Sequence, residues 1–363
     1  MDFTETEAQR DLAALTRRIL ADKVTPEMLG RHGTGGFDRG LWQDLAKAGI
    51  VDAALPYPLG GGFGVLEQCS VLIEIGRAVA PVPYLPTVTM AAAALAEFGD
   101  GALLERWGVP VVRGDKILAV ALPDAGAPCG FTASRTSGGW RISGSQTAVA
   151  FGAFADGFLI AAETPEGSAV FVLDADEGVE ARAQSVIDHA DAALVTVSEA
   201  SGTPLGEPGS GVPEWLRLRG TVGLCALQLG VLNGALTATA EYTKLRKQFD
   251  RAIAAFQAVR QRLADAYIDV EAVRLTLWQA AWRLAEGLPA AEEVAVAKYW
   301  AAEAGHRVAH TAVHLHGGVG IDVDHSLHRY FAAAKRTEFA LGGATAQLRV
   351  LGDLLATTGS EPS

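Results

Sequence analysis

The sequence predicts a chain in three parts: an all-α N-terminal domain, a small β-barrel or sandwich, and a C-terminal bundle of long helices. Apolar residues recur at three- and four-residue spacing up to about residue 115 and again from residue 212, which is typical of helices. Between these regions, short apolar runs alternate with clusters of Gly, Pro and Asp, which indicates short strands. We therefore predict domains at residues 1–115, 116–205 and 206–363.

The N-terminal third contains the signals of four helices. Thr4 and Glu7 have the spacing of a capping box, and apolar residues then repeat with helical spacing. Asp38 can cap a second helix that ends at Gly49. After a loop at Gly60–Gly62, two further apolar helical segments are predicted, at residues 65–79 and 87–98.

The middle third changes to strand patterns. Short apolar runs at residues 117–122 and 169–173, and an alternating run at residues 140–144, predict strands. Residues 199–211 are rich in Gly, Pro and Ser and predict a turn-rich linker. Helical patterns then continue to the end of the chain, with breaks at residues 287–289 and 316–318, so four or five long helices are expected to form a bundle.

Composition excludes several classes of protein. The 363 residues are 49% hydrophobic and 20% charged, which suits a globular chain. The net charge of −12 disfavours nonspecific nucleic-acid binding, which needs a basic surface. The three cysteines lie far apart, and we find neither a signal segment nor an 18-residue apolar run that suggests a membrane span. A cytoplasmic location without membrane contact is therefore expected.

One short turn between two long helices carries the strongest functional signal. It brings together Arg246, Gln248 and Phe249, with residues 215–244 and 258–270 predicted helical on either side. Arginine offers a planar fork of donors for phosphate, and phenylalanine offers a flat apolar face. These residues suit a nucleotide diphosphate with a ring system beside it, although a helix corner with a surface arginine and a core phenylalanine would give the same pattern.

The sequence of this turn resembles a motif of the acyl-CoA dehydrogenases, R-x-x-F-G-x-x-[IL]-x-x-x-Q. Here the segment reads RKQFDRAIAAFQAVRQRLADAY, with Asp250 in place of the usual glycine. LWQDLAKAGIVDAALPYPLGGGFG is similar to the N-terminal domain of the same family. The resemblance implies the acyl-CoA dehydrogenase fold, with an N-terminal all-α domain, a middle β-barrel and a C-terminal four-helix bundle. It also implies FAD, with this turn contacting the diphosphate of the FAD held by a neighbouring subunit.

The chain also matches a second motif of the family, Q-x-x-G-G-x-G. The matching segment is HLHGGVG, with His314 in place of glutamine. Glycines at this point let backbone N–H groups approach a ligand closely. The resemblance therefore implies the following cofactor-binding residues: Arg246, Gln248, Phe249, Phe256, Gln257, His314, Gly317 and Gly318.

The catalytic base of the family is missing from both of its usual places. The family's glutamate stands either 23 residues beyond the second glycine, which is Leu341 here, or 26 residues before the arginine, which is Gly220. Neither residue can accept a proton, so no catalytic residue is predicted. Glu338 and Glu241 lie nearby and are alternatives for a displaced base.

The flavin platform of the middle domain is also altered. Where the family has a Trp-x-Thr word against the flavin ring, this chain has Ala148-Val149-Ala150, and the upstream T-E-P-x-x-G-S-D word is reduced to residues 122–126, LPDAG. The half-site for a neighbour's FAD is thus retained, while the half-site for the chain's own FAD and base has eroded.

His306, His310 and His314 recur at four-residue spacing, a pattern that can bind zinc. No cysteine or H-E-x-x-H context accompanies them and the family needs no metal, so we expect no metal site.

The pattern is similar to the base-lacking β-type subunits of actinobacterial heterotetrameric acyl-CoA dehydrogenases that act on steroid (cholesterol) side chains. The segments FGVLEQ and HRYFAAAKRTEFALGGAT carry this likeness. It implies an α2β2 complex with a homologous catalytic subunit that shares FAD, an acyl-CoA substrate, and electron-transfer flavoprotein as acceptor. Two alternatives remain: a homo-oligomeric flavoenzyme with a relocated base, and a cofactor-free scaffold or acyl-CoA-binding protein.

Overall fold

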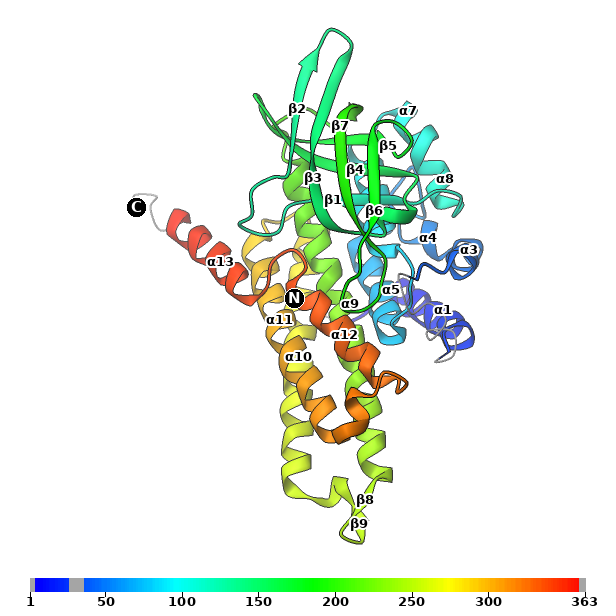
Figure 1. Ribbon diagram of the computed structural model, residues 1–363, viewed down its shortest axis with the longest axis vertical. Helices are drawn as coiled ribbons and strands as arrows, with labels where there is room; N and C mark the ends of the chain where they lie inside the picture. Colours follow the sequence, from blue (N-terminus) through cyan, green and yellow to red (C-terminus); the bar gives the residue numbers. More distant parts are fainter. Residues whose placement is uncertain (1–3, 26–35, 359–363) are drawn as a thin grey trace. The chain divides into compact units, whose positions relative to one another are not determined.

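The computed structural model describes residues 4–25 and 36–358. The chain divides into two compact units. The first unit contains the described parts of Met1–Gly30, with Cys69–Ala80 and Leu224–Ser363, and the second contains those of Arg31–Gln68, with Pro81–Gly223. Figure 1 shows the elements of both units in sequence colours.

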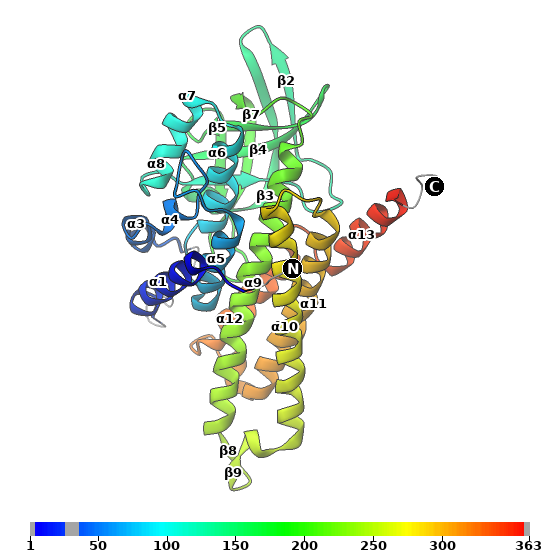
Figure 2. The ribbon, with the colours of Figure 1, turned by 180° about the vertical axis from the view of Figure 1, so that it is seen from behind.

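The first unit is helical. Its members are α1 (Glu7–Lys23), most of α5 (Val65–Ala78), the larger part of α9 (Val212–Leu245), α10 (Gln257–Ala285), α11 (Ala291–His316), α12 (Leu327–Phe339) and α13 (Ala344–Thr358). The five helices from α9 onward confirm the predicted C-terminal helical domain. The long helices α10 and α11 lie alongside each other. The β8–β9 hairpin (Lys247–Gln248 and Arg251–Ala252) follows the C-terminal end of α9 and precedes the N-terminal end of α10 (Figures 1 and 2).

Backbone contact joins α5 to α9. A Cβ atom added to Gly76 would lie 2.1 Å from the carbonyl oxygen of Leu227, and one added to Gly230 would lie 2.0 Å from the carbonyl oxygen of Ile73. Both distances are far shorter than a carbon–oxygen contact allows, so only glycine lets these two helices approach so closely.

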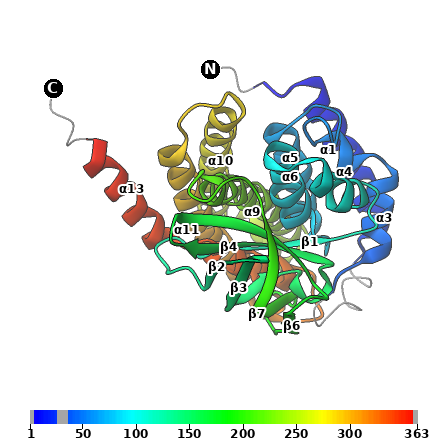
Figure 3. The same ribbon diagram turned by 90° about the horizontal axis from the view of Figure 1, so that it is seen from above.

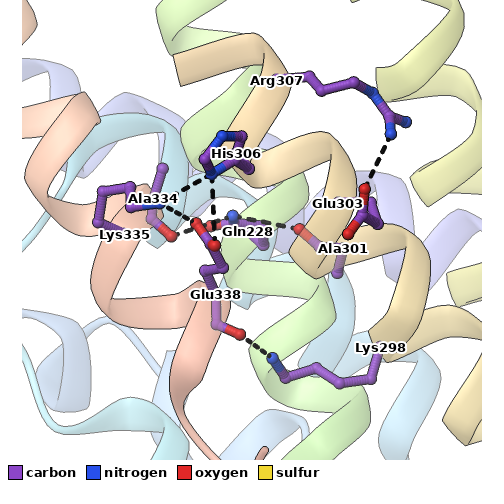
Figure 4. Close-up of polar contacts among 9 residues, drawn as sticks. All are labelled: Gln228, Lys298, Ala301, Glu303, His306, Arg307, Ala334, Lys335 and Glu338. Atoms are coloured by element: carbon purple, nitrogen blue, oxygen red, sulfur yellow. Dashed lines mark hydrogen bonds and ion pairs between the residues drawn. The ribbon is translucent and has the colours of Figure 1, made fainter. Parts of the chain in front are cut away.

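Two buried polar side chains connect α9, α11 and α12 (Figure 4). The amide nitrogen of Gln228 donates to the carbonyls of Ala301 and Ala334, at 3.3 and 3.2 Å. The Nζ atom of Lys298, which is fully buried, donates to the carbonyls of Thr337 and Glu338 at 2.9 and 3.0 Å. These carbonyls end α12, where unpaired C=O groups attract a cation, so Lys298 fixes the start of the turn that follows.

The second unit contains the β-barrel (Figure 3). Its strands are β1 (Leu118–Ala121), β2 (Phe131–Thr136), β3 (Gly139–Ala150), β4 (Gly157–Thr164), β5 (Gly167–Asp174), β6 (Val179–Ala183) and β7 (Ala192–Pro204). They pair in the order β1-β4-β2-β3-β7-β5, and β5 pairs again with β4. This last pairing closes the sheet on itself, so the structure selects the barrel over the sandwich. The barrel encloses an apolar core that includes Phe131, Trp140, Phe158 and Phe171.

Helices complete the second unit. They are α3 (Arg39–Lys47), α4 (Ile50–Ala53), the π-helix η1 (Leu85–Ala92), α6 (Ala93–Phe98), α7 (Gly101–Leu103), the π-helix η2 (Leu104–Gly108), α8 (Val109–Val112) and the short 3₁₀ turn η3 (Gly152–Phe154). The side chain of Asp38 accepts a hydrogen bond from the backbone N–H of Leu41, which confirms the predicted cap of α3.

Two sequence-based predictions were wrong in detail. The capping box at the first helix is formed by Thr6 and Gln9, because α1 begins two residues later than expected. The predicted linker at residues 199–211 is strand as far as Pro204, because this end of β7 pairs with β3 and β5. Ladder hydrogen bonds from these neighbours outweigh the turn-like composition of this segment.

Within the described residues, α9 is long and apolar enough to cross a membrane by length and composition. Two thirds of its most apolar window, 67%, is buried inside the chain, as in the core helix of a globular protein.

Candidate functional site

The predicted turn is an ordered hairpin at the end of α9. Lys247 pairs with Ala252 and Gln248 with Arg251, and the carbonyl of Arg246 accepts a hydrogen bond of 2.8 Å from the N–H of Ile253. A 3₁₀ turn, η4 (Ile253–Ala255), then leads into α10, which begins at Gln257. The structure therefore brings Arg246, Gln248 and Gln257 to one end of the helical unit.

The tip of the hairpin explains the aspartate in place of glycine. Phe249 and Asp250 have φ angles of 53° and 62°, as required at the two central residues of a tight hairpin. Glycine is favoured at such angles, and aspartate is among the few other residues that tolerate them well. Asp250 can thus replace glycine without loss of the turn.

Phe249 is 85% exposed, the largest value among the exposed large apolar residues of the described chain. Its ring meets that of Phe256 edge to face at 6.2 Å, and the guanidinium carbon of Arg251 lies 4.1 Å from the centre of the Phe256 ring. An exposed aromatic held at a strained tip is typical of a residue that contacts a ligand or another chain.

The side chain of Arg246 makes no hydrogen bond or ion pair with any residue that the structure describes. Its guanidinium keeps its donors available to an external anion. The neighbouring Gln248 is exposed, and its amide nitrogen donates only to the adjacent carbonyl of Lys247. The turn therefore presents a cation, an amide and an aromatic ring to solvent.

The second glycine-containing segment follows α11. Gly317 has φ 64° and ψ −141°, and a Cβ atom at Gly317 or Gly318 would meet nothing within 4 Å. The open space above this backbone leaves room for a ligand rather than for a packed neighbour. His314 is exposed on the last turn of α11.

A contact that the sequence did not predict joins the two segments. The rings of Tyr242 and His316 are stacked with centroids 4.1 Å apart, and Tyr242 lies one helical turn before Arg246 on α9. The Nδ1 atom of His316 lies 2.8 Å from the carbonyl oxygen of Ala312 and must carry the proton, because a carbonyl only accepts. Burial lowers the pKa of His316, so the ring is neutral at pH 7.

The two predicted base positions carry no carboxylate. Leu341 lies in the turn between α12 and α13 with φ 53°, and Gln347 donates to the carbonyls of Leu341 and Gly342 at 3.0 and 3.3 Å. Gly220 is buried within α9. The turn at Leu341 is thus held by polar contacts at its backbone, although its side chain cannot take up a proton.

The two nearby glutamates are already paired. The carboxylate of Glu338, 12% exposed, contacts Lys335 at 2.5 Å and His306 at 3.5 Å (Figure 4). Glu241 is 61% exposed and pairs with Lys244 at 2.6 Å.

The segment predicted to stand in place of the flavin platform lies in β3 of the barrel. Ala148 has φ 56°, and its N–H donates to the side-chain oxygen of Gln184 at 2.8 Å. Val149 is buried, while Ala148 is exposed. The side chains of Ala148 and Ala150 are methyl groups, at the two positions where the resemblance predicts an aromatic ring and a hydroxyl.

A cavity of about 600 Å³ lies between α10 and α11, beside Arg262 and Asp265. The three histidines with four-residue spacing, His306, His310 and His314, line it. Partial desolvation lowers the pKa of His310, although the residue is exposed, and the nearby His306 and Lys335 lower it further. Across the part of the chain that is described, no group of three His, Cys, Asp or Glu side chains has the arrangement of a metal site.

Comparison with known proteins decides the family. The "Acyl-CoA dehydrogenase, C-terminal domain" family matches residues 218–355, and the "Acyl-CoA dehydrogenase, N-terminal domain" family matches residues 6–115. Acyl-CoA dehydrogenase FadE27 of Mycobacterium tuberculosis is 50% identical, over 99% of this chain and 100% of that protein. The chain belongs to the acyl-CoA dehydrogenase family.

Two solved structures resemble this acyl-CoA dehydrogenase closely. A chain of the ChsE4-ChsE5 complex from Mycobacterium tuberculosis superposes with a TM-score of 0.95 at 49% identity, with 100% of both chains covered. A chain of a variant of the Tcur3481-Tcur3483 steroid ACAD superposes with a TM-score of 0.92 at 39% identity, covering 98% of this chain and 99% of that one. Both matches confirm the predicted acyl-CoA dehydrogenase fold.

Proposed function

We propose that this acyl-CoA dehydrogenase chain is the non-catalytic subunit of a heteromeric enzyme and completes the FAD site of a catalytic partner. One contrast carries the proposal. The turn that would reach a neighbour's cofactor presents the free guanidinium of Arg246 and the exposed ring of Phe249, whereas Leu341 and Gly220 stand where the family places its base.

Each retained residue has a role in this proposal. Arg246 binds the diphosphate of the partner's FAD, and Gln248, Gln257 and His314 supply polar contacts beside it. Phe249 and Phe256 give the nucleotide an apolar surface, while the backbone at Gly317 and Gly318 approaches it closely. Bound FAD supplies the hydride acceptor of the reaction, and the partner supplies the carboxylate that removes the α-proton of the acyl-CoA.

The relatives support a proposal for the substrate and the partners. Two structures similar to this chain are described as the ChsE4-ChsE5 complex and as a steroid ACAD. We propose a steroid side-chain CoA ester as substrate, a homologous catalytic subunit in an α2β2 assembly, electron-transfer flavoprotein as acceptor, and a cytoplasmic location. The three-domain division at residues 1–115, 116–205 and 206–363 belongs to the same proposal.

Expression with and without a partner tests the proposal. The chain is produced alone and together with a catalytic acyl-CoA dehydrogenase subunit from the same source, and flavin absorbance is measured in each purified sample. We expect little flavin in the chain alone and a yellow, active complex on co-expression. A yellow, active homo-oligomer would establish the relocated-base alternative, and a colourless chain that never assembles with a partner would support the scaffold alternative.

A further inference from the structure

A second cavity of the helical unit is lined by arginines. It has a volume of about 340 Å³ and lies among α1, α5, α9 and α10. Figure 2 shows these four helices. Four guanidinium groups line it: those of Arg10, Arg17, Arg77 and Arg274. Two carboxylates, of Glu5 and Glu74, also line it, so its lining carries two more positive than negative charges in a chain whose net charge is −12.

A buried carboxylate holds two of these arginines. The side chain of Glu74 is only 3% exposed, and both of its oxygens accept hydrogen bonds of 2.8 Å from Arg17. The Nε atom of Arg77 lies 3.3 Å from the same carboxylate. One anion thus orients two guanidinium groups, and most of their remaining N–H donors have no acceptor on Glu74.

The other two arginines add further donors. Arg274 pairs with Glu271 at 2.7 Å, and Glu5 acts electrostatically on both Arg274 and Arg17. The side chain of Arg10 has no hydrogen bond or ion pair within the described residues. Four guanidinium groups offer roughly 20 N–H donors, against about 12 lone-pair sites on the three carboxylates. The cluster therefore has donors to spare for an external anion.

We propose that this cavity binds a small phosphate-bearing anion, such as pyrophosphate or the phosphates of a nucleotide. Arginine forks match the tetrahedral oxygens of phosphate, and several converging forks favour a multiply charged group over a single carboxylate. A concave space of this volume accommodates such a group, at the lower end of the range of ligand pockets. The apolar wall, which includes Ile73, Leu229 and Trp278, leaves room for a nonpolar part of the ligand.

This site is separate from the proposed FAD contact. Neither Arg246 nor any other residue of the hairpin lines the cavity. Because its lining residues come from helices far apart in the sequence, a bound anion would join α1 to α5, α9 and α10 and raise thermal stability.

Titration of the flavin-loaded complex tests the proposal. Inorganic phosphate, pyrophosphate and ADP are each added at constant ionic strength, and binding is followed by calorimetry and by Tm. We expect pyrophosphate to bind with Kd of roughly 1 mM or tighter and to raise Tm. Arg10→Gln and Arg274→Gln should each weaken binding about tenfold or more. Arg18→Gln, the same charge change at an exposed residue of α1 outside the cavity, should not weaken it.

The outcomes separate the sources of the phosphate. Tighter binding of ADP than of pyrophosphate identifies a nucleotide, and equal binding identifies the phosphate groups alone; either result supports the site. The proposal is overturned if pyrophosphate and ADP produce neither heat nor a Tm shift at about 10 mM. It is also overturned if Arg10→Gln and Arg274→Gln bind as Arg18→Gln does, or if Arg246→Ala is the change that abolishes binding.

Discussion

Arg246 is the residue on which the proposed FAD contact chiefly depends. Its guanidinium is free, and the backbone around it is fixed by the hairpin pairing of Gln248 with Arg251 and by the hydrogen bond from Ile253. A preorganised donor loses little entropy when it binds phosphate, because the turn need not become ordered first.

Arg246→Ala should therefore strip FAD from the complex without unfolding this subunit. Losing a charge-assisted phosphate contact costs about 1.5–3 kcal/mol, which is roughly tenfold to a hundredfold in affinity. Flavin content after dialysis measures the effect, with Arg349→Ala on the exposed face of α13 as a matched control. Full flavin occupancy in Arg246→Ala at low free FAD would remove Arg246 from the cofactor site.

His316 gives the helical unit a pH dependence of known sign. Burial lowers its pKa below the ordinary value of about 6.5, so the unfolded chain binds more protons than the folded chain as pH falls. The contribution of neutral His316 to the free energy of unfolding is fully present above about pH 6.5. It declines as pH falls from about 6.5 toward the pKa of His316 in the folded chain. His310 contributes in the same direction.

We expect Tm to fall between about pH 6.5 and pH 5, and His316→Gln to make this fall shallower while lowering Tm at pH 7.5. Thermal unfolding over this range, followed by circular dichroism, measures both effects. A variant with the same slope as the wild type would show that protonation of His316 does not contribute.

The local sequence predicted that Arg246, Gln248 and Phe249 lie in one turn, because all of the residues of this segment lie within twelve positions of each other. The Tyr242–His316 stack was not predicted. It depends on how the end of α11 aligns with the end of α9, and residues 74 positions apart carry no local signal of such alignment.

At the scale of elements, the contact of α5 with α9 depends on two glycines. Gly76 and Gly230 face carbonyl oxygens of the opposite helix, so neither backbone has space for a side chain.

Gly76→Ala and Gly230→Ala should each destabilise the chain by about 1–3 kcal/mol, since a rigid backbone must move to admit the methyl group. Gly352→Ala on α13 is the matched control, because its Cβ atom would meet nothing within 4 Å and alanine favours helix. Urea unfolding gives the three free energies. Equal stability of Gly76→Ala and Gly352→Ala would contradict the close approach of α5 and α9.

Helices were more predictable than strands. The periodicity of α10 and α11 repeats over many turns, and α9 is apolar over a long stretch. By contrast, β7 includes the segment EASGTP, whose composition is that of a turn. Its strand conformation comes from pairing with β3 and β5, and a local pattern carries no signal of pairing partners that are distant in sequence.

At the scale of the whole molecule, the chain has the fold of an enzyme family and has no carboxylate at Leu341 and Gly220, the two positions predicted for the base. The sequence predicted the fold because segments that resemble acyl-CoA dehydrogenases occur in both the N-terminal and the C-terminal third of the chain. The strand pattern alone left barrel and sandwich open, and the family resemblance implied the barrel; its closure requires that β5 pair with both β4 and β7.

Neither displaced glutamate should act as the base. In the complex, Glu338→Gln and Glu241→Gln should each leave turnover within a few-fold of wild type, because both carboxylates are engaged by lysines. Loss of a general base costs on the order of 100-fold to 10,000-fold, so steady-state kcat distinguishes the two cases. A loss of that size from either variant, with flavin content and assembly intact, would place the base in this chain.

Flavin stoichiometry of the purified complex tests the half-site proposal most directly. If only the partner holds a complete flavin platform and this chain contributes the hairpin of Arg246 and Phe249, flavin absorbance against protein mass gives one FAD per pair of unlike subunits. One FAD for every chain would contradict the proposal, because each subunit would then hold a complete site of its own.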